Sequence, residues 1–251
     1  ASGSLSYRLD DDALQLRSTP TTNAFTRHNI GGAWGGPLLP NRLFYHTSFQ
    51  LGRNVNHRYA LAADDPLASQ RSGVHVDSIA RFLSILRDRH GITALGQSGR
   101  YRQISDDIRL QGRLDWNLLQ RQGQSQTLSA RFNLSLNDQD STRISALDVA
   151  HHGGEMERNN RLAAVTLTSR FGGRWINSFS LSYGESWSDA LPYIQLPEGV
   201  VRVVSDFEDG TRNSSRLVFG GNRSMPTEAR SRDFQISDDL SFLLPVGFQL
   251  H

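Results

Sequence analysis

The stretch DIRLQGRLDWNL, which covers residues Asp107–Leu118, decides the fold class. Its even positions from Ile108 to Leu118 hold apolar residues and one glycine, and its odd positions from Arg109 to Asn117 hold charged or amide residues. Successive side chains of a β-strand point to opposite faces. The stretch is therefore predicted to be a strand with one apolar face and one strongly polar face.

The same alternation recurs along the chain. After a Gly/Gln-rich turn, Leu128, Phe132 and Leu136 share one parity and Thr127 and Arg131 share the other. We expect an all-β fold of about eight antiparallel strands, with residues 248–251 as the start of a ninth. The predicted strands cover residues 4–9, 25–36, 43–51, 107–118, 127–136, 161–171, 178–183 and 233–244.

The predicted connections fall into two length classes. Short turns are expected at 36–42, 119–125, 171–174 and 244–247, and long loops at 10–23, 55–99, 137–159 and 188–230. Short turns on one side and long loops on the other are typical of an outer-membrane β-barrel and not of a soluble sandwich. The longest loop also contains a helical apolar stripe at about 76–89, with Asp77 or Ser78 as its expected N-cap and Gly91 as its end.

Composition excludes several classes of protein. The 251 residues contain no cysteine, which excludes disulfide scaffolds, cysteine zinc sites, iron–sulfur clusters and thiol nucleophiles. No apolar run approaches 18 residues, so no transmembrane helix is expected, and the first residues lack a signal-peptide profile. All 27 basic residues are arginine, and the net charge of +2 does not indicate nucleic-acid binding. A hydrophobic fraction of 37% suits strands with a single apolar face.

The polar parity suggests what the barrel interior would contact. Arg109, Arg113, Asp115 and Arg131 are bulky and charged, and they suit a wet or plugged lumen in which they contact a solute or a plug. This favours an arc of a large barrel, although a small filled barrel can also hold a charged interior network. Aromatic residues near the strand ends are candidates for interfacial girdles, or are ordinary strand aromatics: Trp34, Tyr45, Trp116, Phe171, Trp175 and Tyr183.

One segment resembles a known family. Residues Asn23–Arg53 read NAFTRHNIGGAWGGPLLPNRLFYHTSFQLGR. This is similar to a recurring signature of TonB-dependent outer-membrane transporters, in the branch with an N-terminal carboxypeptidase-regulatory-like domain. The matching positions are Arg27, Gly31, Gly32, Gly35, Gly36 and Pro37, followed by Leu43, Phe44, Tyr45 and Arg53. The asparagine (Asn29) and the last glycine (Gly52) each come one residue late, and Ile30 replaces an aromatic residue. Segments 3–14, 112–118 and 234–251 resemble further family strands more weakly.

The resemblance implies a barrel of roughly 22 strands around an internal plug. It implies active uptake of a nutrient across the cell outer membrane, driven by an energy-transducing inner-membrane partner. Residues 1–251 would then be a partial barrel domain that lacks the plug and the remaining strands, with 55–99 as a long extracellular loop. The expected partners are outer-membrane lipid, the plug, the energy-transducing partner, and a surface lipoprotein or another subunit on the long loops.

Other candidate sites are weaker. His151, His152 and Glu155 lack metalloprotease spacing and are predicted to lie in a solvated loop, and no metal site is expected. Acidic clusters at 10–12, 138–140 and 206–209 are predicted to be solvated loop charges, with loop-bound calcium as the second interpretation and no other cofactor. The Gly31–Gly36 segment lacks the Lys-Ser/Thr of a phosphate loop.

Two alternatives to a transporter remain open at this level. One is a small self-contained outer-membrane barrel with a structural or adhesion role. The other is an outer-membrane barrel enzyme or a soluble β-protein with hydrolytic loops. The sequence contains no G-x-S-x-G elbow and no catalytic constellation, so we expect a protein that is not an enzyme.

Overall fold

The computed structural model describes residues 1–14, 24–63, 72–92, 99–243 and 249–250. Strands account for most of the described residues. The elements are β1 (Ser2–Asp11), η1 (Asp12–Leu14), β2 (Phe25–Leu39), β3 (Leu43–Tyr59), α2 (Val76–His90), β4 (Arg100–Arg121), β5 (Gln124–Thr142), η2 (Ala150–His152), β6 (Gly154–Phe171), β7 (Trp175–Pro192), β8 (Glu198–Asp206), β9 (Arg212–Gly220), β10 (Thr227–Leu243) and β11 (Gln249–Leu250).

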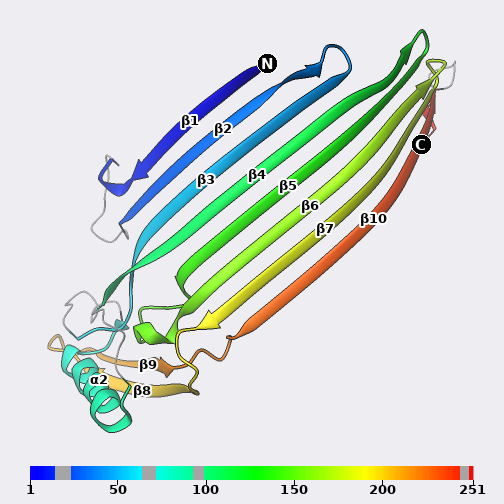
Figure 1. Cartoon of the computed structure of the whole chain (residues 1–251). Coiled ribbons are helices and arrows are strands. Elements are labelled where there is room, and N and C mark those ends of the chain that lie inside the picture. The colour runs from blue at the N-terminus through cyan, green and yellow to red at the C-terminus, as the bar shows by residue number, and fades with distance from the viewer. Residues whose placement is uncertain (15–23, 64–71, 93–98, 244–248, 251) are drawn as a thin grey trace.

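Eight long strands form one antiparallel sheet whose order follows the chain. The order is β1-β2-β3-β4-β5-β6-β7-β10, and β11 pairs with the end of β10. Figure 1 shows these strands running side by side, with β1 and β10 at opposite edges. The prediction of an all-β fold with antiparallel strands is therefore confirmed. Within the described residues the sheet is open, and it does not close into a barrel.

The two faces of the sheet differ as the alternation predicts. We call the face that carries Leu110, Leu114 and Phe132 the apolar face, and the face that carries Arg109 and Arg113 the polar face. Strand pairing joins Leu110 to Phe49 on one side and to Leu134 on the other, so apolar residues meet across strands. Leu114 and Phe132 each expose 45% of their surface. In the described part of the chain no second sheet covers the apolar face, so the sandwich alternative does not fit.

Tight turns join the strands at one end of the sheet. Residues 122–123 connect β4 to β5, and residues 172–174 connect β6 to β7. Gly123 has φ 76°, and this left-handed backbone favours glycine. The short turns predicted at 119–125 and 171–174 are therefore confirmed. The turn predicted at 244–247 and much of the loop predicted at 10–23 lie outside the described residues.

The connections at the other end are shorter than predicted. β3 continues to Tyr59, and β5 and β6 together leave only residues 143–153 between them. Likewise, β7 extends to Pro192 and β10 starts at Thr227. These strand ends carry polar residues on both faces, which removed the alternation signal while leaving the backbone pairing intact. The hairpin β8–β9 inside the 193–226 connection was not predicted.

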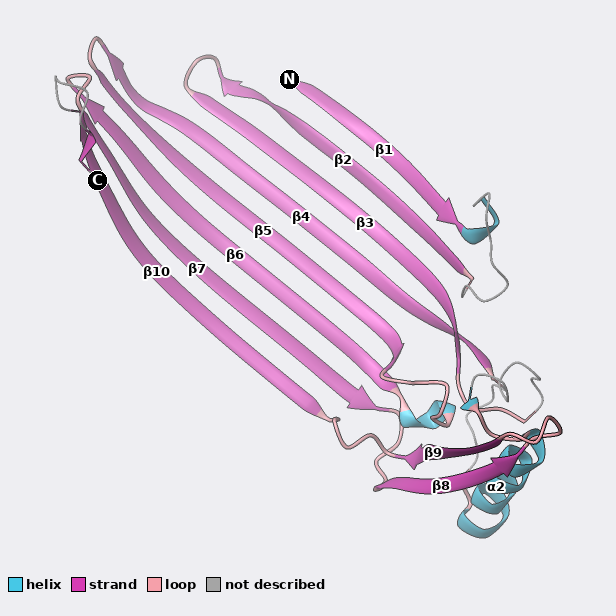
Figure 2. Ribbon diagram, turned by 180° about the vertical axis from the view of Figure 1, so that it is seen from behind, coloured by secondary structure: helices cyan, strands magenta, loops and turns pink. Residues whose placement is uncertain are grey.

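A small loop unit lies at the long-loop end of the sheet. It consists of α2, the hairpin β8–β9 and the segment around Val149, and Figure 2 shows α2 beside the hairpin. Its core includes Ile79, Phe82 and Leu86 from α2, Val149 from the β5–β6 connection, and Leu217 from β9. The helix and its apolar stripe are therefore confirmed, and the stripe is covered by the hairpin.

The ends of α2 fit the prediction only in part. Gly91 ends the helix with φ 62°, as expected. The N-cap is His75, whose Nδ1 accepts a hydrogen bond from the backbone N–H of Asp77 at 3.3 Å. Asp77 and Ser78 were wrong as candidates because the helix starts earlier, at Val76. Among the described residues, no helix combines the length and apolar character needed to cross a membrane.

Candidate functional site

The four predicted contact residues all lie on the polar face, in the adjacent strands β4 and β5. Arg113 is the direct cross-strand partner of Arg131, and Asp115 is two residues further along β4. Arg109 lies four residues from Arg113 in the opposite direction, beside Gln50 of β3. The structure therefore brings three of the four residues together and places Arg109 apart from them.

Arg113, Asp115 and Arg131 form a charged cluster. The Nε of Arg113 donates to Oδ1 of Asp115 at 3.0 Å and lies 2.8 Å from Oδ2. The hydroxyl of Ser129 donates to the same carboxylate at 2.6 Å, which fixes Asp115 between two strands. Arg113 and Arg131 are directly opposite one another, and Asp115 supplies a single negative charge against these two positive ones, so the cluster keeps a net positive charge that favours an anionic or strongly polar contact from outside the sheet.

Arg109 belongs to a separate depression of about 530 Å³ over β1–β4. Most of its lining is contributed by polar-face hydroxyls, amides and arginines. The lining residues are Ser4, Ser6, Arg8, Asn29, Gly31, Gly32, Ala33, Ser48, Phe49, Gln50, Arg109 and Gln111. Such a surface can donate and accept hydrogen bonds, so it suits a polar solute or a polar segment of a plug.

Most of this depression could not be found from the sequence. Sequence reasoning singles out only Arg109, Gly31 and Gly32, the glycines as family motif positions. The polar parity of residues 4–8 and 48–50 is visible, but nothing local to the sequence shows that β1, β2, β3 and β4 are consecutive neighbours. Gly31 lies in the polar row that joins Ser6 to Gln50, where the absence of a side chain leaves the depression open.

The neighbouring glycine has a different role on the apolar face. A Cβ at Gly32 would lie 2.7 Å from Cε1 of Phe49 and 3.0 Å from Cη2 of Trp34. The rings of Phe49 and Trp34 stack with centroids 5.5 Å apart and an interplanar angle of 14°. The glycine of the family-like motif thus makes room for an aromatic pair, which accounts for part of the motif by packing alone.

The apolar residues form a band that runs obliquely to the strands. On β1 the band ends at Leu9. If the direct strand partner is followed from each strand to the next, the row of partners that starts at Leu9 reaches β10 at Glu228. The last apolar residue of β10 on that side is Phe234, six residues further along. The edge near the tight turns shifts the same way, because the row of Trp116 reaches β10 at Asp238 while the band continues to Phe242.

Aromatic residues lie along both edges of this band. Near the tight turns, Phe171 pairs with Trp175, which in turn contacts Phe242 with ring centroids 4.5 Å apart. Near the long loops, Tyr183 pairs with Phe234. One carboxylate interrupts the band at Asp238, where it accepts a hydrogen bond from Nδ2 of Asn177 at 2.6 Å.

No family model matches the chain, and no curated protein matches it. The function of the chain is therefore inferred from the two faces of the sheet and from the loop unit.

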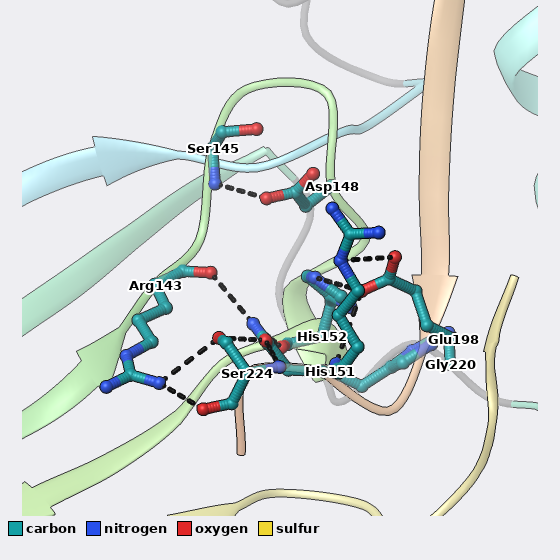
Figure 3. Close-up of polar contacts among 10 residues, drawn as sticks. Arg143, Ser145, Asp148, His151, His152, Glu198, Gly220 and Ser224 are labelled. Carbon is teal, nitrogen blue, oxygen red and sulfur yellow. Dashed lines mark hydrogen bonds and ion pairs between the residues drawn. The ribbon is translucent and has the colours of Figure 1, made fainter. Parts of the chain in front are cut away.

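The histidine pair does not lie in a solvated loop, and that prediction was wrong. His151 and His152 form η2 and expose only 1% and 6% of their surfaces. Figure 3 shows them next to Glu198 and Gly220 of the hairpin. The backbone N–H of Gly220 donates to Nε2 of His151 at 3.1 Å, and Nε2 of His152 lies 3.9 Å from Oε2 of Glu198. Packing by the hairpin, a distant segment, buries residues that their flanking glycines had suggested were exposed.

Burial affects the charge state of His151. It lowers the pKa of His151 below its ordinary value of 6.5, and the neighbouring His152 acts in the same direction. Nε2 of His151 accepts a hydrogen bond from the backbone N–H of Gly220, so the ring is neutral with its proton on Nδ1. The pair acts as a polar contact between η2 and the hairpin. Glu155, the third member of the predicted motif, lies on β6 opposite Leu191.

The acidic clusters do not form a metal site in the described part of the chain. No group of three or more histidine, cysteine, aspartate or glutamate side chains there could hold a metal ion. Asp209 instead accepts hydrogen bonds from the backbone and hydroxyl of Thr211, at 2.9 Å and 2.6 Å, which lowers its pKa. Asp140 accepts a hydrogen bond from the hydroxyl of Tyr193, where burial, followed by this bond, raises the pKa of Tyr193 to about 12.

Proposed function

We propose that this chain forms part of the wall of an outer-membrane transport barrel of the TonB-dependent class, which takes up a nutrient. The observation that carries this proposal is the contrast between an uncovered apolar band on one face and a continuous polar surface on the other. A soluble sheet would bury its apolar face against another layer. Lipid is the environment in which that face needs no protein cover.

The slope of the band supports the membrane assignment. Its edge shifts by six residues, about 20 Å, over seven strand steps, about 34 Å, which corresponds to an angle of about 30°. Strands of membrane barrels are tilted by roughly 35–45° to the membrane normal, so a band parallel to the membrane must cross them obliquely. A band perpendicular to the strands would not suit a tilted barrel wall.

The open edges of the sheet favour a larger barrel. One side of β1 and most of one side of β10 have no strand partner among the described residues. In lipid each unpaired backbone group costs several kcal/mol, so a spanning sheet must close. We infer that further strands complete the wall, as in the roughly 22-stranded class, and that the polar face lines a lumen shared with a plug.

The polar face provides the solute-side chemistry in this proposal. The depression around Arg109 and Gln111 and the cluster of Arg113, Asp115 and Arg131 are both accessible from that face. Arginine keeps its charge at all relevant pH values and donates forked hydrogen bonds. The two regions are therefore the contact points for a polar solute or for the plug that controls its passage.

The absence of cysteine permits a clean test of the two faces. Leu181→Cys and Ser182→Cys occupy consecutive positions on opposite faces of β7, in the full-length protein inserted into outer membranes. A water-soluble maleimide is expected to label Ser182→Cys and to spare Leu181→Cys until detergent is added. Equal labelling of both variants in intact membranes would contradict a lipid-facing apolar band.

The transport activity needs a separate test. Cells with and without the gene are compared for growth on single limiting nutrients, in strains with and without the energy-transducing inner-membrane complex. We expect growth on at least one nutrient to require both. If the faces label as predicted but no nutrient depends on the gene, the structural or adhesion alternative would replace the transporter.

A further inference from the structure

The hairpin β8–β9 has one face and one edge that the rest of the described chain does not cover. Val201 and Val203 face α2 and the core of the loop unit, together with Leu217 of β9. The opposite face of β8 presents Val200 and Val204, which expose 44% and 47% of their surfaces. Figure 2 shows α2 beside the hairpin, and the core that α2 forms with Val201, Val203 and Leu217 accounts for only one of the two faces of the hairpin.

β8 is also the free edge of its sheet. Its only strand neighbour among the described residues is β9. The other side of β9 is occupied, because Val218 exchanges backbone hydrogen bonds with Leu147 and Val149. Natural proteins usually protect such edges with charged side chains, with prolines or with bulges, and β8 carries one such charge at its centre, Arg202. On either side of this charge β8 keeps a regular register over nine residues and presents two exposed valines.

A pair of like charges marks the centre of this open face. Arg202 of β8 is directly opposite Arg216 of β9, and both side chains are exposed. Within the described residues neither arginine forms an ion pair with a carboxylate, whereas Arg212 nearby pairs with Asp206 at 3.4 Å. Like charges directly opposite each other destabilise a strand pair, and one exposed charge would already protect the edge, so edge protection does not account for the second arginine.

We propose that β8 is a docking edge for an extended, acidic segment of another protein, which adds to the hairpin as a third strand. The backbone of the segment would pair with β8, a carboxylate at its centre would lie beside Arg202, and apolar residues two positions away on either side would lie beside Val200 and Val204. This inference is independent of transport, since it concerns the loop unit and not the sheet.

A second copy of the same chain does not fit this edge. Arg202 is the middle residue of β8 (Glu198–Asp206), so antiparallel pairing of two β8 strands about their centre would set Arg202 against its own copy. That arrangement would add a third and a fourth guanidinium to the existing pair. An acidic partner removes the repulsion instead.

The test measures binding of labelled peptides to the full-length protein in detergent micelles. The probe is the peptide TTVTETVTT, which places its glutamate between two valines on one face. We expect it to bind, and to bind at least tenfold more weakly to the Arg202→Glu/Arg216→Glu double variant. The matched control is Arg81→Glu, which reverses an exposed charge on α2 and should leave binding unchanged.

Two further peptides make the result specific. TTVTKTVTT should bind the unaltered protein weakly and regain binding on the double variant, which would rule out simple unfolding. Two versions of TTVTETVTT carry N-methyl groups on alternate backbone amides, one version in each register. The version whose methylated amides point toward β8 should lose binding, and the other version should keep it. The proposal is overturned if TTVTETVTT does not bind at concentrations up to millimolar, or if the lysine peptide binds equally well. It is also overturned if both methylated versions bind undiminished, or if the protein binds anionic phospholipid vesicles in place of the peptide.

Discussion

The ring of Phe49 lies directly against the backbone of Gly32, so close that a Cβ at Gly32 would fall 2.7 Å from Cε1 of the ring. The contact lies on the apolar face, between two neighbouring strands. Trp34, two residues along, completes the aromatic stack on Phe49. The glycine is therefore a packing requirement of this pair of strands.

Replacing this glycine should destabilise the sheet. Gly32→Ala forces the Phe49 ring away from Trp34, and we expect a loss of about 1–3 kcal/mol of unfolding free energy from overpacking. The measurement is urea unfolding of the full-length protein in detergent micelles. Gly31→Ala is the matched control, because its Cβ would meet no atom closer than 3.4 Å. Equal losses in the two variants would contradict the steric explanation.

A charge on the apolar face should be costly, and the same charge on the polar face should not. Leu181→Arg puts a guanidinium among Val165 and Ile236, and we expect a loss of about 2–4 kcal/mol in lipid vesicles. Ser182→Arg is one residue away on the polar face and should cost less than about 1 kcal/mol. A similar cost for both, measured by unfolding from vesicles, would argue against lipid contact.

Acid should loosen the contact between η2 and the hairpin. The pKa of His151 is lowered in the folded state, so the unfolded form binds more protons below about pH 6.5 and this part of the stability is lost as the pH falls through that range. It is fully present above the ordinary pKa of 6.5. Protonation also abolishes the hydrogen bond from the Gly220 N–H.

The expected result is faster protease cleavage in the 193–226 connection as the pH falls below about 6.5. His151→Gln, whose amide oxygen can still accept the bond, should flatten this dependence. His90→Gln, at an exposed position in α2, should leave it unchanged. Cleavage that follows the same pH profile in all three proteins would show that His151 is not the responsible group.

Removing the centre of the loop unit should have a local effect. Leu217 is completely buried among residues of α2 and Val149, and Leu217→Ala should cost the unit about 2–5 kcal/mol. Hydrogen exchange in α2 should rise sharply while exchange in β4–β7 stays unchanged. Leu196→Ala, at an exposed position, is the control. Loss of protection throughout the sheet would show that the two regions unfold together.

The strands were predictable because their signal is local. Alternation from Ile108 to Leu118 needs no knowledge of the rest of the chain. The pairing of Arg113 with Arg131 was not predictable, since it depends on the two-residue turn at 122–123 and on an irregular register between Asn117 and Leu119. The assignment of these residues to the polar face still followed correctly from parity.

The loop unit was less accessible to sequence reasoning. The stripe of α2 was visible, but its cover comes from β9, more than 120 residues later in the chain. The burial of His151 and His152 depends on the same hairpin, whose turn signal, Asp209-Gly210, was interpreted only as part of an acidic loop cluster. Residue type and local spacing therefore predicted solvent exposure for two histidines that are buried, because their burial depends on a contact with a distant connection.

The core of the loop unit also bears on the order of assembly. Leu61 follows β3, Val149 lies between β5 and β6, and Leu217 belongs to the connection that precedes β10. Each of these contacts closes a large loop of chain. The entropic cost of closing such a loop becomes small only after the intervening hairpins have paired, because their pairing shortens the loop that remains. The sheet can grow by adding neighbours in chain order, whereas the loop unit can form only after β3–β7 have aligned their ends. We therefore expect the loop unit to form late in folding, and its protection from proteases would report that the sheet has paired in the correct register.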